Sequence, residues 1–106
     1  MLRVEFNDDG SGALRVRLFG RMVGLYAEDA RNALANRQLP ASIVVDLSEV
    51  TFVDLLGEQV LLWLGRLGAK FVANHVYMRS VCEDLQLHIS EKPTGVDSER
   101  DTSVLP

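Results

Sequence analysis

The chain has 106 residues, 47% of them hydrophobic and 25% charged, a composition typical of one soluble globular domain. Eleven basic against 15 acidic residues leave a net charge of −4, which disfavours general binding to nucleic acid or to anionic lipid, because both require a basic surface. The single cysteine, Cys82, cannot form an internal disulfide, so we expect a reducing compartment and a cytoplasmic protein. The N-terminus shows no signal-peptide pattern, and no apolar run is long enough to insert into a membrane.

The beginning of the chain predicts a β-hairpin. Residues 2–7 and 14–20 both alternate apolar with polar side chains, which is the pattern of strands with one buried face. The Gly- and Asp-rich stretch between them is a dense turn signal, so the two strands should pair antiparallel. We expect Arg15 and Arg17 to pair with Glu5 across this hairpin, with little effect on stability.

A helix and a central strand should follow the hairpin. Residues 25–37 change to a helical period, with Leu25 and Leu34 on the apolar face. Residues 43–47 begin with three consecutive β-branched side chains, which is typical of a central strand buried on both faces. Residues 48–51 are then predicted to be a loop.

Two further helices and a short strand complete the pattern. Asp54 is a good N-cap for a helix over residues 55–67, because its carboxylate can accept hydrogen bonds from the free amides of the first turn. Residues 69–73 indicate another strand. Residues 77–87 indicate a third helix, with Cys82 on its apolar side.

The order of these elements, β-β-α-β-α-β-α, predicts an α/β fold of mixed α+β type. It should consist of a small four-stranded mixed β-sheet flanked by helices, in which the hairpin is antiparallel and the later strands are parallel, with right-handed crossovers. The domain should span residues 1–88. After residue 88 the apolar pattern fades, so residues 89–106 are predicted to form a polar C-terminal tail or a weakly held extension.

No group of residues in the sequence points to catalysis, a metal or a cofactor. His75, Cys82 and His88 lack the spacing of metal ligands. No serine lies in a nucleophile-elbow context, and no phosphate-binding glycine loop is present. Asp54 and Glu58, four residues apart, are better explained as a helix cap and a first-turn acid than as an acid–base or metal pair. We therefore predict that the protein is not an enzyme and needs no cofactor.

Residues 43–57 read Ile-Val-Val-Asp-Leu-Ser-Glu-Val-Thr-Phe-Val-Asp-Leu-Leu-Gly. This run resembles the signature of the STAS domains, the sulphate-transporter and anti-sigma-factor-antagonist family, in its Asp-Leu strand end, its Val-Thr-Phe turn and its Asp-x-x-Gly helix start. Residues 18–24 look like the family's entry to its first helix, and residues 68–72 look like its fourth strand. The resemblance covers about residues 2–87 and implies a STAS-like fold.

The resemblance also identifies the position of the family's regulatory serine. In phosphorylatable members, a serine two residues after the Asp stands at the helix N-terminus, and a kinase-type anti-sigma factor phosphorylates it. The added charge, about −1.5 to −2, then breaks the partner interface. In this chain Leu56 occupies that position and has no hydroxyl. The nearby hydroxyls of Ser48 and Thr51 do not match the motif, so the resemblance implies the interaction surface without the phosphorylation switch.

The function implied by the resemblance is that of a non-enzymatic domain that binds a protein partner, an anti-sigma factor or kinase-like protein. Binding would use the second predicted helix and the loop before it. The expected partner-binding residues are Asp54, Leu55, Leu56, Gly57, Glu58 and Leu62. The leucines of this helix cannot all point into the core, so apolar surface should remain exposed for a partner or for a homodimer contact.

Two other functions stay open. A constitutive STAS subunit could bind the ATPase of a bacterial lipid-transport ABC complex, with Tyr26 and Trp63 as aromatic anchors. A neighbouring gene for such an ATPase would favour this alternative, whereas one for an anti-sigma kinase would favour the regulator. Binding or conversion of a small molecule is the third class, and no cluster of polar residues in the sequence supports it.

Overall fold

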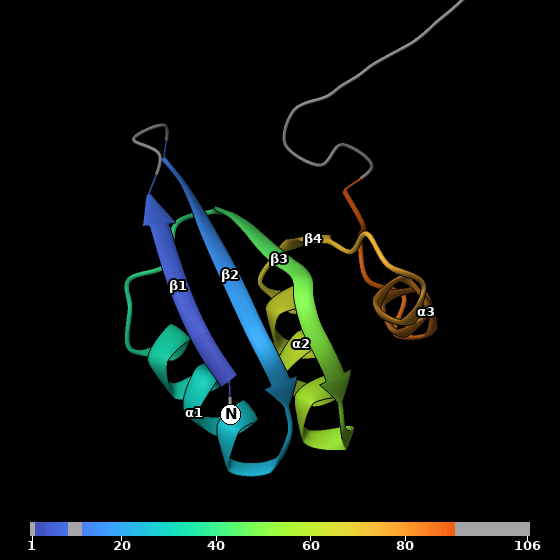
Figure 1. Ribbon diagram of the computed structural model, residues 1–106. Helices are drawn as coiled ribbons and strands as arrows, with labels where there is room; N and C mark the ends of the chain where they lie inside the picture. The colour runs from blue at the N-terminus through green and yellow to red at the C-terminus, as the bar shows by residue number, and fades with distance from the viewer. Residues whose placement is uncertain (1, 9–11, 91–106) are drawn as a thin grey trace, which may run out of the picture.

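The computed structural model describes residues 2–8 and 12–90, in which a four-stranded mixed sheet carries three helices (Figure 1). The elements in chain order are β1 (Leu2–Asp8), β2 (Ala13–Met22), α1 (Gly24–Ala35), β3 (Ser42–Val53), α2 (Leu55–Arg66), β4 (Lys70–Val72) and α3 (Val76–Asp84). The strands lie in the order β1-β2-β3-β4, with β1 antiparallel to β2 and the other pairs parallel. The predicted fold class and element order are confirmed.

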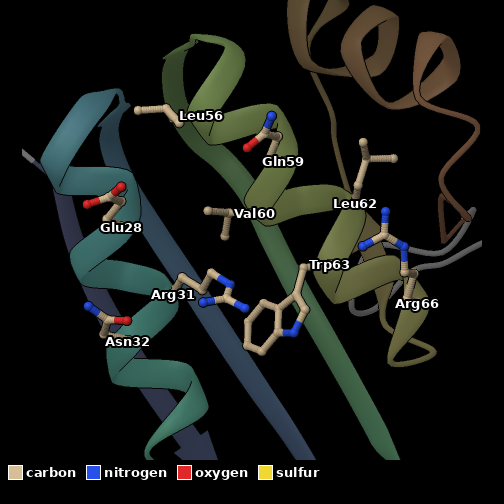
Figure 2. Close-up of a pocket in the computed structure, with 9 residues that line it drawn as sticks. All are labelled: Glu28, Arg31, Asn32, Leu56, Gln59, Val60, Leu62, Trp63 and Arg66. Atoms are coloured by element: carbon tan, nitrogen blue, oxygen red, sulfur yellow. The ribbon is translucent and has the colours of Figure 1, made fainter.

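The core lies against the sheet and includes side chains of all three helices, of which α1 and α2 cover the same face of the sheet (Figures 1 and 2). Alternate residues of β2 and β3 point into it because side chains alternate between the two faces of a strand. The strands contribute the buried residues Leu14, Val16, Leu18, Ile43, Val45 and Leu47. Leu34 of α1 and Leu61 and Leu64 of α2 are fully buried against them.

Strand β3 is longer than the sequence predicts, since residues 48–51, expected to be a loop, continue the strand. Two shifts in its register with β2, opposite Arg17–Phe19 and Gly20–Arg21, each place one extra residue in β3. Such bulges increase the local twist and keep a strand beside its neighbour. The Thr51 hydroxyl also donates to the Gly20 carbonyl (3.3 Å). Pairing with β2 therefore turns the expected loop into strand.

Two expectations about burial are wrong. Leu25, expected on the apolar face of the first helix, is 74% exposed. The buried stripe of α1 runs through Ala27 and Leu34, and Leu25 lies on the opposite side of the helix, because residues two apart are about 200° apart. Val44, expected to be buried on both faces of the sheet, is only partly buried, because α1 and α2 cover one face only.

Charged side chains line the face of the sheet opposite α1 and α2. Arg15 and Arg17, expected to pair with Glu5, instead contact Asp46 of β3, with N–O distances of 3.5 and 3.8 Å. Asp46 stands directly opposite Arg17 in the parallel register, which puts the two side chains on the same face. Glu5 pairs with Arg3 at 3.1 Å. The acidic residue that each arginine contacts thus depends on which strand lies beside β2 in the sheet. The sequence of the hairpin alone does not determine this.

The chain continues along the outer edge of β4 after α3. The Phe71 N–H donates to the His88 carbonyl (2.9 Å), and the Ser90 N–H donates to the Phe71 carbonyl (2.7 Å). Ile89 forms an isolated parallel bridge with Phe71. The rest of the tail expected over residues 89–106 lies outside the described residues. Within the described part, no helix has the length and apolar character needed to cross a membrane.

Candidate functional site

The helices begin where the parallel strands end. A parallel strand followed by a helix places the helix N-terminus near the carboxyl end of that strand, where open α/β sheets commonly bind their ligands. Figure 1 shows α1 and α2 starting beside the arrowheads of β2 and β3. The first turns of these helices are therefore neighbours although they are distant in sequence.

The Asp54 carboxylate joins the starts of α1 and α2. Its Oδ1 accepts from the Gly57 N–H (2.9 Å), and its Oδ2 accepts from the Gly24 N–H (3.0 Å). As predicted, Asp54 is the N-cap of α2. The hydrogen bond from Gly57, followed by those from Gly24 and Leu56, holds the pKa of Asp54 below its usual value of 3.8.

This lowered pKa predicts a pH-dependent contribution to stability. Because the folded chain binds the Asp54 proton less tightly than the unfolded chain, the stabilisation is complete above about pH 4 and is lost as the pH falls further. We expect Asp54→Asn to lower the thermal midpoint by several degrees at pH 7 and by less at pH 3, because an amide has one acceptor oxygen and cannot accept from both the Gly57 and the Gly24 N–H groups. Circular dichroism melts measure both values.

The matched control for Asp54→Asn is Asp29→Asn, at an exposed position of α1. It removes one negative charge at a side chain that does not cap a helix, so its midpoint should stay near that of the wild type. An Asp54→Asn deficit of equal size at pH 7 and pH 3 would show that the ionised carboxylate is not the stabilising group.

Gly57 allows α2 to lie directly against β2. It is buried, and a Cβ added there would collide with the backbone oxygen of Met22 and lie 2.8 Å from Cγ1 of Val53. The Asp-x-x-Gly spacing therefore has a physical reason: the Asp caps the helix, and the Gly removes the side chain that would separate the helix from the sheet. Within the expected partner-binding set, Gly57 thus acts through packing.

Exposed apolar side chains lie mainly at the starts of the three helices and at the end of β3. Among the described residues, eight large hydrophobic side chains are exposed, and seven of them lie in the first turn of a helix or at the end of β3. We call these seven the helix-start patch: Leu25, Tyr26, Phe52, Leu55, Leu56, Val76 and Tyr77. In α2, Leu55 is 68% exposed and Leu56 is 39% exposed. The expected exposure of leucines on this helix is therefore found at its N-terminus.

Side chains at the start of α3 bind the end of β3. The Tyr77 hydroxyl accepts from the Val53 N–H (3.0 Å) and donates to the Val53 carbonyl (3.3 Å), and its ring stacks on Phe52 with centroids 6.2 Å apart. His75 is the N-cap of α3: its Nδ1 accepts from the Met78 N–H (3.4 Å). Its Nε2 therefore carries the proton and donates to the Val50 carbonyl (3.1 Å). These contacts attach the α3 part of the helix-start patch to the sheet.

A groove of about 720 Å³ runs between α1 and α2 and includes Leu56. Figure 2 shows its lining side chains, which are Glu28, Arg31 and Asn32 from α1 and Leu56, Gln59, Val60, Leu62, Trp63 and Arg66 from α2. The Arg31 guanidinium lies 4.9 Å from the centroid of the Trp63 ring.

The groove brings together only some of the expected partner-binding residues. Leu56 and Leu62 line it, whereas Glu58, expected beside them, does not. Gln59 lines it because it follows Leu56 by three residues and so shares its face of the helix. Gln59 was not among the residues predicted from the sequence, although this spacing was a usable signal. Arg31 was not predicted either, because it belongs to another helix and carries no such signal.

Among the described residues, neither Cys82 nor the possible metal ligands form a further site. Cys82 is fully buried in α3, and this burial raises the pKa of its thiol to about 11, so very little reactive thiolate forms near neutral pH. No group of three or more His, Cys, Asp or Glu residues in the described segments could hold a metal ion.

No protein-family profile and no curated protein sequence matches the chain. Among solved structures, it is similar to an anti-sigma factor antagonist from Mycobacterium paratuberculosis, with a TM-score of 0.64 and 19% identity over 86% of this chain and 88% of the other. It is also similar to the anti-sigma factor antagonist SpoIIAA in its unphosphorylated form, with a TM-score of 0.64 and 16% identity over 86% of this chain and 90% of the other. The chain therefore has the STAS-like fold of the anti-sigma factor antagonists.

Proposed function

We propose that the chain is a non-enzymatic, cytoplasmic interaction domain of the anti-sigma factor antagonist type, which binds a protein partner through the first turn of α2. The observation that carries this proposal is the exposure of Leu55 and Leu56 beside the Asp54 cap, in a fold shared with two anti-sigma factor antagonists. An exposed cluster of large apolar side chains is a common mark of a protein interface.

The absence of a hydroxyl at Leu56 supports constitutive binding. Leu56 is the second residue of α2 and stands where the resemblance to STAS domains puts the phosphorylated serine. A leucine cannot accept phosphate, and its contribution to a complex comes from apolar burial rather than from a reversible charge. The partner should therefore stay bound when a kinase and ATP are present.

Affinity capture in the presence and absence of ATP tests this function. The wild-type chain is immobilised, native lysate is applied, and retained proteins are identified by mass spectrometry together with any phosphate on the chain. We expect an anti-sigma factor or kinase-like protein, retained equally with and without ATP. Release by ATP with phosphate on the chain would contradict constitutive binding. A transport ATPase retained instead would support the alternative of a constitutive subunit, in which Tyr26 and Trp63 contact the partner.

A further inference from the structure

The two edges of the sheet differ in how they are covered. Residues 88–90 lie along the outer edge of β4 and make the two backbone hydrogen bonds with Phe71 described above. On the other side β1 is the last strand of the sheet and pairs only with β2 within the described part of the chain (Figure 1). The outer backbone N–H and C=O groups of an edge strand are a template for pairing with another chain.

β1 lacks two of the features that prevent such pairing in many edge strands, a bulge and a proline. Its register with β2 is continuous. Leu2, Val4 and Phe6 point towards the helix side of the sheet and are only partly buried. Arg3 and Glu5 lie exposed on the opposite face, the only charged residues between Leu2 and Phe6.

We propose that β1 pairs antiparallel with β1 of a second copy of this chain, about a two-fold axis at Val4. The two sheets then form one continuous eight-stranded sheet with an isologous interface. In this register Arg3 of each copy faces Glu5 of the other, and Leu2 of each copy faces Phe6 of the other. Opposite charges and apolar pairs directly across two antiparallel strands are stabilising. The partly buried apolar row of β1 is thereby extended across the axis.

Other registers are disfavoured by the same side chains. Moving the axis by one residue to Arg3 or to Glu5 places two arginines or two glutamates directly opposite each other, which is destabilising. Registers that pair an odd-numbered with an even-numbered residue place the charged face of one copy beside the apolar face of the other. Of the registers centred on Arg3, Val4 or Glu5, only the one centred on Val4 therefore pairs opposite charges.

Reversing one of the two charges at a time tests the proposal. Arg3→Glu makes this part of β1 wholly negative, and Glu5→Arg makes it wholly positive. Sedimentation equilibrium of the tag-free wild-type chain should show a concentration-dependent dimer of about twice the 11.8 kDa chain mass. Each variant alone should raise the dimer dissociation constant by about tenfold or more. A 1:1 mixture of the two variants should restore the dimer, because every charge then faces its opposite.

The matched control is Lys70→Glu, which reverses an exposed charge on β4 at the opposite edge and should leave the dimer unchanged. Leu56→Asp should also leave it unchanged, so failure of this inference is separable from failure of the proposed function. Circular dichroism checks that each variant is folded. A wild-type chain that stays monomeric throughout the concentration series overturns the proposal, as does a dimer that persists in both charge variants.

Discussion

Gly57→Ala is expected to destabilise the domain by about 2–3 kcal/mol or more, a large part of the roughly 5–15 kcal/mol that stabilises a typical domain. The added Cβ would meet the Met22 backbone oxygen and lie 2.8 Å from Cγ1 of Val53. Neither contact is the end of a flexible side chain, so α2 would have to move away from β2. Urea denaturation followed by circular dichroism measures the loss in the free energy of unfolding.

Gly65→Ala is the matched control, because it makes the same substitution two turns further along α2. Both changes gain about 0.8–1 kcal/mol of helix propensity. At Gly65, however, the new Cβ would meet only the Cδ2 atom of Leu87, at 3.0 Å, which a flexible side chain can relieve. This variant should be as stable as the wild type or more so. If the two variants unfold at the same urea concentration, close packing at Gly57 is not what the Asp-x-x-Gly motif provides.

Leu56→Asp is expected to weaken partner binding by about tenfold or more while the domain stays folded. Burial of one leucine in an interface contributes roughly 1.5–3 kcal/mol, and 1.4 kcal/mol corresponds to a factor of about ten in affinity. The fold should tolerate the change because Leu56 is 39% exposed and a carboxylate is favourable in the first turn of a helix. Isothermal titration calorimetry with the captured partner measures the effect.

Leu67 provides the comparison for this experiment. It is 42% exposed, close to the value for Leu56, but lies at the opposite end of α2. Leu56→Gln should weaken binding, and Leu67→Gln should bind as the wild type does. If circular dichroism shows that Leu56→Asp is unfolded, Leu56 belongs to the core and the site assignment is wrong. If the folded variant binds with wild-type affinity, the partner surface lies elsewhere.

Local patterns in the sequence predicted most of the secondary structure. The alternation in residues 14–20 and the N-cap at Asp54 are both properties of short segments, and β2 and α2 formed where they indicated. The presence of exposed apolar side chains on α2 also followed from the number of leucines on one helix. Errors appeared where another element decides the outcome: β3 extends through residues 48–51 because it pairs with β2 through two bulges.

The sequence by itself determined the order of strands and helices along the chain and the Asp54 cap, because the spacing of apolar residues and hydrogen bonding within one helical turn are local. It also showed directly that position 56 has no hydroxyl. Only the tertiary structure decided that Asp54 also binds Gly24, 30 residues away, and that Gly57 packs against the backbone of β2. It also decided that Arg31 lies over Trp63. These contacts form because consecutive parallel strands bring the starts of their helices to one end of the sheet, a long-range arrangement that no single segment encodes.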